Sequence, residues 1–122
     1  LFHSMAFGLG GTGAGALRRE IAAFIREHPE LEIAETPMRD WVKWDSGKSV
    51  SSYASSMAVS GWGGGIEMAA CSQLKKVNVH VYERSMLGTY KRISCFDFDE
   101  KPGRKTLHVL YCGGVHYDAL VP

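Results

Sequence analysis

The sequence predicts an α+β fold in which helices pack on a small, mostly antiparallel sheet. Two observations lead to this prediction. Before Val77 the apolar residues recur at helical spacing, whereas after it they alternate with polar residues, as they do in β-strands. Helices therefore precede strands along the chain, an order typical of α+β folds rather than of repeated βαβ units. A length of 122 residues suits one domain, residues 1–122, with its own hydrophobic core.

The first half of the chain is expected to be mainly helical. Leu1 and Met5 lie one helical turn apart, so the first residues are expected to form a helix with one apolar face. A second helix follows a Gly-rich stretch and carries Leu17 and Ile21 on its apolar stripe. Residues 30–50 have no clean period and are expected to form an irregular connection with a short helix at most. The helices are expected at residues 1–7, 16–28, 49–57 and 66–75.

The second half of the chain is expected to form the sheet. Val77, Val79 and Val81 alternate with polar residues and would face one side of a strand. The dipeptide Pro102-Gly103 is a strong turn signal between the second and third strands. The strands are expected at residues 77–83, 89–98, 106–112 and 116–120.

Composition restricts the kinds of partner. The formal charge of +1 gives no electrostatic reason to expect a nucleic acid, and no apolar run approaches the length of a membrane span. We therefore expect neither a nucleic acid nor a membrane as partner. The five histidines lack zinc-ligand spacing, so no metal and no cofactor are expected.

The cysteines predict a reducing environment. Cys71, Cys95 and Cys112 are odd in number and form no C-x-x-C pair, so a disulfide framework is not expected. We expect a cytoplasmic or nuclear protein. All three lie within helical or strand-like runs, where a buried structural thiol is the ordinary interpretation.

The segment "HYDAL" near the C-terminal end places proton-transfer groups together. In a strand, His116 and Asp118 share a face and Tyr117 points away. The carboxylate can then fix the tautomer of the imidazole, leaving its other nitrogen as a general base. The alternative is an ordinary polar strand end, which is the simpler interpretation from spacing alone.

Two Gly-rich stretches have both a functional and a structural interpretation. Gly8–Gly13 fits the G-x-G-x-x-G pattern of dinucleotide-binding units, but no Val- or Ile-rich strand precedes it, so a flexible loop between helices is the alternative. The glycines of "GWGGG" allow close approach of the backbone to a neighbour. The structural alternative is that Trp62 fills the core and that the glycines only turn the chain.

Three blocks of the sequence together resemble the ovarian-tumour (OTU) family of cysteine deubiquitinases. They are "LFHSMAFGL", "YASSMAVSGWGGGIEMAACSQLKKVNVHVYE" and "GGVHYDAL", and they span nearly the whole chain. The resemblance implies a papain-related cysteine protease fold. It also implies hydrolysis of isopeptide bonds after the C-terminal Gly-Gly of ubiquitin, with ubiquitin or polyubiquitin as partner, by a protein that we expect to be a monomer.

The resemblance also assigns residue roles. The family's nucleophilic Cys would fall immediately before Leu1, so we expect the chain to be a piece of a longer protein. His116 would be the general base and Asp118 the orienting acid, although in some members that acid comes from the loop before the nucleophile. A narrow substrate channel would be shaped by Trp62, Gly113, Gly114 and Tyr117. An inactive ubiquitin-binding module and a nucleotide-binding domain using Gly8–Gly13 remain as alternatives.

Overall fold

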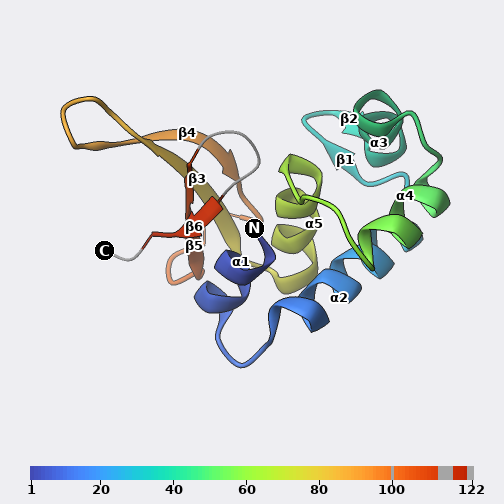
Figure 1. Ribbon diagram of the computed structural model, residues 1–122, viewed down its shortest axis with the longest axis horizontal. Coiled ribbons are helices and arrows are strands. Elements are labelled where there is room, and N and C mark those ends of the chain that lie inside the picture. The colour runs from blue at the N-terminus through green and yellow to red at the C-terminus, as the bar shows by residue number, and fades with distance from the viewer. Residues whose placement is uncertain (100, 113–116, 121–122) are drawn as a thin grey trace.

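The computed structural model describes residues 1–99, 101–112 and 117–120. Helices in this part of the chain are α1 (Phe2–Leu9), α2 (Ala14–Glu27), α3 (Met38–Ser46), α4 (Val50–Met57) and α5 (Gly65–Lys75). Strands are β1 (Glu32–Ile33), β2 (Thr36–Pro37), β3 (Asn78–Arg84), β4 (Tyr90–Phe96), β5 (Thr106–Tyr111) and β6 (Tyr117–Ala119). Helices dominate the first half and strands the second, as predicted (Figure 1).

The main sheet has four described strands in the order β4-β3-β5-β6. Strand β3 pairs antiparallel with β4 and parallel with β5, and β5 pairs antiparallel with β6. The sheet is therefore mixed but mostly antiparallel. Although β4 and β5 are consecutive in the chain, β3 lies between them, so the turn at Pro102-Gly103 does not close a hairpin.

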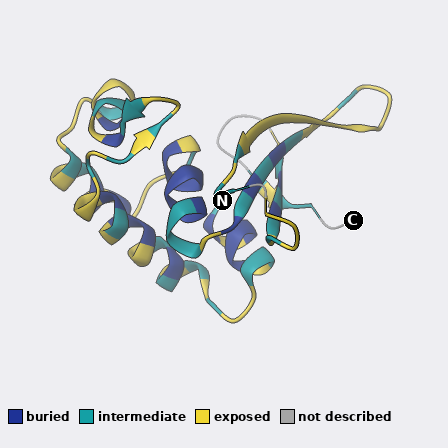
Figure 2. Cartoon of the chain, turned by 180° about the vertical axis from the view of Figure 1, so that it is seen from behind, coloured by how far each residue is buried: buried dark blue, intermediate teal, exposed yellow. Residues whose placement is uncertain are grey.

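One face of the sheet builds the hydrophobic core together with the helices. Helix α1 packs against β5 and β6, and helix α5 packs against β3 and β4. Alternate residues of the two central strands are buried, namely Val79, Val81, Leu107 and Val109. Figure 2 shows that the buried surfaces of the helices and of these strands face one another, whereas β4 is exposed along most of its length.

The connection across residues 30–50 is more regular than the sequence suggested. It contains α3 and a two-stranded sheet of β1 and β2. Met38 and Val42, one turn apart, are fully buried and anchor α3. The turn between β1 and β2 places Ala34 and Glu35 at positive φ angles of 51° and 66°, a conformation usually signalled by Gly or Asn. Because these positions hold Ala and Glu instead, the sequence does not predict this hairpin.

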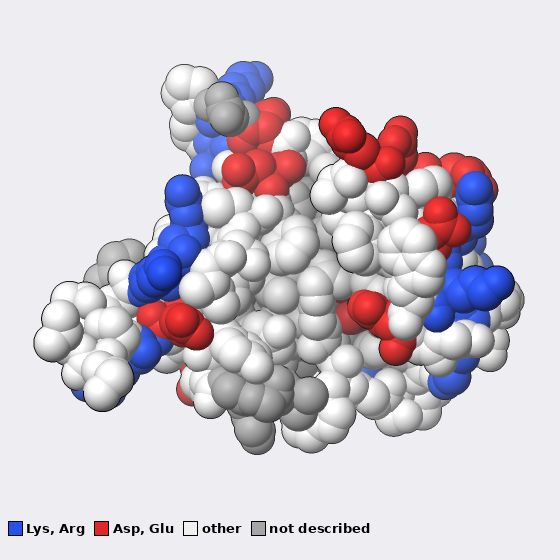
Figure 3. Space-filling model, turned by 90° about the horizontal axis from the view of Figure 1, so that it is seen from above, with Lys and Arg blue, Asp and Glu red and all other residues white. Residues whose placement is uncertain are grey.

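The surface has no dominant sign of charge on the face shown in Figure 3. Acidic and basic side chains both lie on that face, on either side of a central area that is largely uncharged. None of the helices in the described residues is long and apolar enough to cross a membrane.

Candidate active site

The N-terminal helix lies beside the last described strand, although they stand at opposite ends of the sequence. Ser4 Oγ in α1 donates a hydrogen bond to the main-chain oxygen of Tyr117 in β6, at 3.0 Å. The backbone nitrogen of Leu1 lies near both the Arg18 guanidinium and the Asp118 carboxylate, close enough for electrostatic interaction with each. The first and last sequence blocks therefore meet in space.

The central Gly-rich loop reaches the same place. A Cβ atom added at Gly63 would lie 2.9 Å from Leu1 Cδ2 and 3.1 Å from Phe2 Cε2. These distances leave no room for a side chain, so the backbone of the loop approaches α1 closely because residue 63 is glycine. This confirms at Gly63 the close approach expected for this stretch. All three blocks therefore converge around Leu1.

A buried carboxyl group, Glu67 in α5, fixes the loop from the other side. Glu67 Oε1 accepts a hydrogen bond from the backbone N–H of Gly64, at 2.7 Å, and Oε2 accepts one from the hydroxyl of Tyr53 in α4. Glu67 is only 1% exposed, and burial raises its pKa, against the opposing effect of its hydrogen bonds. The spacing between Gly64 and Glu67 is that of a capping box, but glycine has no side chain to complete the motif, so the sequence carries only half of this signal.

Arg18 in α2 ties three elements together near this point. Its guanidinium donates hydrogen bonds of 3.0 Å to the main-chain oxygens of Met57 and Gly61. The same group stacks over the ring of Phe2, 4.3 Å from the ring centroid. The end of α4, the Gly-rich loop and α1 are thus held by one side chain. Sequence analysis missed Arg18 because its three partners come from three separate segments.

Only some of the predicted site residues lie in the part of the chain that the structure describes. His116, Gly113 and Gly114 lie outside the described residues. Asp118 is exposed on β6 and accepts a hydrogen bond from the Cys112 thiol, with Sγ and Oδ2 3.2 Å apart.

The two predicted aromatic residues of the channel also differ from each other. Trp62 is 63% exposed and therefore does not fill the core. Tyr117 is half-buried, and its ring packs against that of Tyr111 with 5.4 Å between centroids. Together with Gly65 and Met68 of α5, the two tyrosines line a cavity of about 280 Å³ between that helix and the sheet.

The structure corrects the prediction that all three thiols are buried. Cys71 is buried as expected, and burial raises its pKa to about 12. Cys95 and Cys112 are exposed, contrary to the expectation of buried structural thiols. Cys95 lies on the edge strand β4, opposite His80 of β3, and Cys112 follows the end of β5. Burial and the Asp118 carboxylate raise the pKa of Cys112, which disfavours its thiolate.

The Gly-rich segment Gly8–Gly13 does not have the structure of a dinucleotide-binding unit. The residues before it form helix α1, and Gly8 itself lies within that helix. Such a unit requires a strand there, from which the phosphate-binding turn begins. The segment instead connects α1 to α2, with Gly10 and Gly11 at positive φ angles of 72° and 69°. The helix-to-helix loop is therefore the correct interpretation.

The fold is shared with OTU domains of known structure. The OTU domain of OTUD1 matches at 18% identity and a TM-score of 0.72, covering 97% of this chain and 75% of that chain. The Hazara virus OTU, solved bound to ubiquitin, matches at 18% identity and 0.72, covering 97% and 71%. An OTU deubiquitinase from Wolbachia pipientis wMel matches at 20% identity and 0.69, covering 98% and 80%.

These matches define the fold. The chain has the α+β fold of OTU domains, as the sequence blocks predicted. No protein-family model and no curated protein sequence matches the chain.

Proposed function

We propose that this chain is the larger part of a cysteine isopeptidase that cleaves after the C-terminal Gly-Gly of ubiquitin. The observation that carries the proposal is the convergence of three sequence blocks around Leu1. Gly63 contacts the Leu1 and Phe2 side chains, and Ser4 is hydrogen-bonded to Tyr117, one residue before Asp118. These blocks are the ones that resemble the OTU deubiquitinases. Two of the similar solved proteins, from Hazara virus and Wolbachia, are bound to ubiquitin.

The nucleophile in this proposal is a Cys immediately before Leu1. Its thiolate would lie at the N-terminal end of α1, where the unpaired backbone N–H groups favour a negative charge. Arg18 adds a cation at this end of α1, since its guanidinium stacks over the ring of Phe2. Thiolate character at neutral pH is what nucleophilic attack on a carbonyl requires.

The remaining roles follow the proposed order of steps. The thiolate attacks the carbonyl carbon of the last glycine of ubiquitin, and His116 gives a proton to the departing lysine amine. Water, deprotonated by His116, then hydrolyses the thioester and releases ubiquitin with a free carboxylate. Asp118 orients the imidazole. Trp62, Gly113, Gly114 and Tyr117 would shape the channel for Gly-Gly, and we place the reaction in the cytoplasm or nucleus.

The decisive experiment uses ubiquitin that carries a C-terminal electrophile. Incubated with the full protein, which includes the residues before Leu1, this probe should form one covalent adduct. Peptide mapping should place the adduct on the Cys before Leu1 and on none of Cys71, Cys95 and Cys112. An adduct on Cys112, which lies beside Asp118, would overturn the assignment.

Two substitutions test the other roles. His116→Ala should abolish cleavage of a ubiquitin conjugate in single-turnover assays, because it removes the general base. Asp118→Asn should slow cleavage less, since it leaves the base in place. Wild-type rates in His116→Ala would remove that residue from the mechanism. Saturable ubiquitin binding by the wild-type protein without any adduct or cleavage would instead indicate an inactive binding module.

A further inference from the structure

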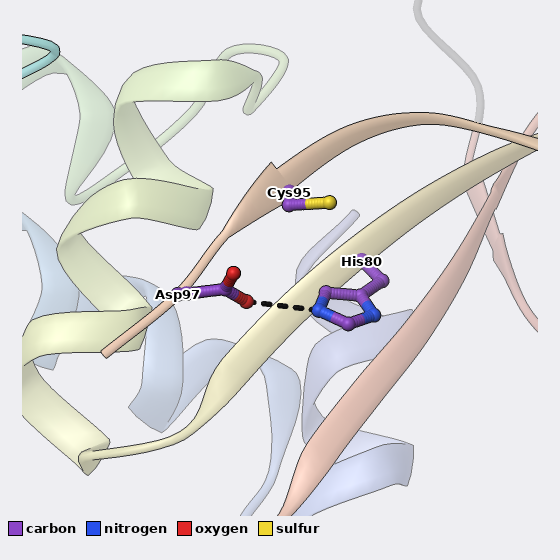
Figure 4. Close-up of side chains that lie close together, drawn as sticks. All are labelled: His80, Cys95 and Asp97. Carbon is purple, nitrogen blue, oxygen red and sulfur yellow. Dashed lines mark hydrogen bonds and ion pairs between the residues drawn. The ribbon is translucent and has the colours of Figure 1, made fainter. Parts of the chain in front are cut away.

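A second cluster of reactive side chains lies on the sheet, on the opposite face of β3 from the core. His80 in β3 is paired across the strands with Cys95 in β4, and Asp97 follows two residues later. Ligand atoms of the three side chains all lie within 4.8 Å of one another. Figure 4 shows the three on the two neighbouring strands, with His80 and Asp97 in direct contact. The sequence does not predict this cluster, because His80 is far from Cys95 and Asp97 in the chain and comes together with them only through the pairing of β3 with β4.

The cluster is held in place by its surroundings. His80 Nε2 and Asp97 Oδ1 are 2.8 Å apart. Just beyond Asp97, the side-chain oxygen of Asn78 in β3 accepts a hydrogen bond of 2.8 Å from the backbone N–H of Phe98. This bond fixes the end of β4 against the start of β3. Asp97 is therefore positioned by the backbone as well as by His80.

The donor set suits a divalent cation. An imidazole nitrogen, a thiolate sulfur and a carboxylate oxygen are three of the ligands that zinc accepts, and together they carry two negative charges. Cys95 and Asp97 are exposed, so an ion can reach these two ligands from solvent. Three protein ligands leave one tetrahedral position for water.

A neighbouring histidine packs against His80. The ring of His108 in β5 lies edge-on to that of His80, with 6.0 Å between centroids, and its Nδ1 is 2.8 Å from the Tyr82 hydroxyl. These contacts fix the His108 ring beside the cluster.

We propose that His80, Cys95 and Asp97 bind one Zn²⁺ ion, with water as the fourth ligand. The ion joins the end of the edge strand β4 to β3. This proposal does not depend on the isopeptidase activity. The alternative is a plain hydrogen bond between His80 and Asp97 with a bystander thiol.

Calorimetric titration of the metal-free chain with Zn²⁺ tests the proposal. Asp97→Asn retains the shape of the side chain but loses its charge, and Cys95→Ser loses the thiolate. Each variant should lose one equivalent of Zn²⁺ or bind it at least about tenfold more weakly. Cys112→Ser is the matched control, since it removes another exposed thiol that contacts a carboxylate, and it should bind Zn²⁺ as the wild type does.

Two further measurements identify the thiolate ligand and test whether Zn²⁺ stabilises the fold. Co²⁺ bound in place of Zn²⁺ should give a thiolate-to-metal charge-transfer band that disappears in Cys95→Ser and persists in Cys112→Ser. Saturating Zn²⁺ should raise the Tm of the wild type but not that of Asp97→Asn. Circular dichroism of the metal-free variants confirms that they are folded. Wild-type affinity in both Asp97→Asn and Cys95→Ser, or loss of the charge-transfer band in Cys112→Ser, would overturn the proposal.

Discussion

The carboxyl group of Glu67 shows how one buried side chain positions a loop at the candidate active site. It joins the hydroxyl of Tyr53 to the backbone N–H of Gly64, so it links α4 to the start of α5. A buried carboxyl is tolerated because both oxygens accept hydrogen bonds. The order of the loop around Trp62 therefore depends on a residue that lies behind it and has no access to a substrate.

The raised pKa of Glu67 predicts a dependence of stability on pH. Because the folded state holds this proton above the ordinary pKa of 4.5, it binds more protons than the unfolded state, and the free energy of unfolding falls as pH rises above 4.5. Glu67→Gln does not titrate, and it can keep both contacts when its carbonyl oxygen accepts from Gly64 and its NH2 group donates to the Tyr53 hydroxyl. Urea unfolding over a pH series should show the wild type losing stability relative to Glu67→Gln as pH rises. Parallel stability curves would contradict this account.

Gly63 offers a second test at a single position. Gly63→Ala places a methyl group against Leu1 and the ring of Phe2, so it should cost about 1 to 3 kcal/mol of unfolding free energy. Gly65→Ala is the control, because its added Cβ would lie 3.6 Å from Phe96, an ordinary contact, at a helical position that favours Ala. Denaturant unfolding of the two variants compares them directly. Equal effects would show that close approach at Gly63 is unimportant.

At the scale of elements, Arg18 is expected to control the mobility of the segment between α4 and α5. Arg18→Lys should not hold the two carbonyls of Met57 and Gly61 together, since an ammonium lacks the fork of a guanidinium. We expect faster amide hydrogen exchange across residues 58–64 and a loss of about 1 to 2 kcal/mol in stability. Arg19→Lys, at the exposed next position of α2, is the control and should leave exchange in this segment unchanged.

Prediction of elements succeeded where one local signal was enough. The apolar stripe of Leu17, Ile21 and Ile25 predicted α2, and all three residues are fully buried. Helix α3 was expected only as a short helix within an irregular connection, because the exposed Trp44 obscures its buried pair of Met38 and Val42. The parallel pairing of β3 with β5 was also not predicted. The turn signal at Pro102-Gly103 shows that the chain reverses direction, but it does not show which strand pairs with β5.

The candidate site was predictable only in part, for a related reason. The resemblance identified the blocks that contain Leu1, Gly63 and Asp118, and the structure brings those blocks together. It did not identify Arg18, whose role depends on contacts across the fold. The cluster of His80, Cys95 and Asp97 has no sequence signature at all, because it exists only once β3 and β4 are paired.

For the whole molecule, the three thiols provide a measure of unfolding. In native protein a small alkylating reagent should modify Cys95 and Cys112 but not Cys71, which is buried with its pKa raised to about 12. The raised pKa of Cys112 should make it react more slowly than in denatured protein at the same pH. Mass spectrometry of time points resolves the three sites. Modification of Cys71 should follow global unfolding and should accelerate in Gly63→Ala, and labelling of Cys71 at the rate of Cys95 would contradict the described core.

The hydrogen bond between Ser4 and Tyr117 spans 113 residues of sequence. During synthesis at about 5 to 20 residues per second, roughly 6 to 23 s separate the appearance of its two partners. Until β6 emerges from the ribosome, the apolar side chains of Phe2 and Met5 in α1 therefore lack the packing that β5 and β6 provide. The nascent chain should depend on chaperones during this interval, and arrest of translation before Tyr117 should leave α1 accessible to proteases.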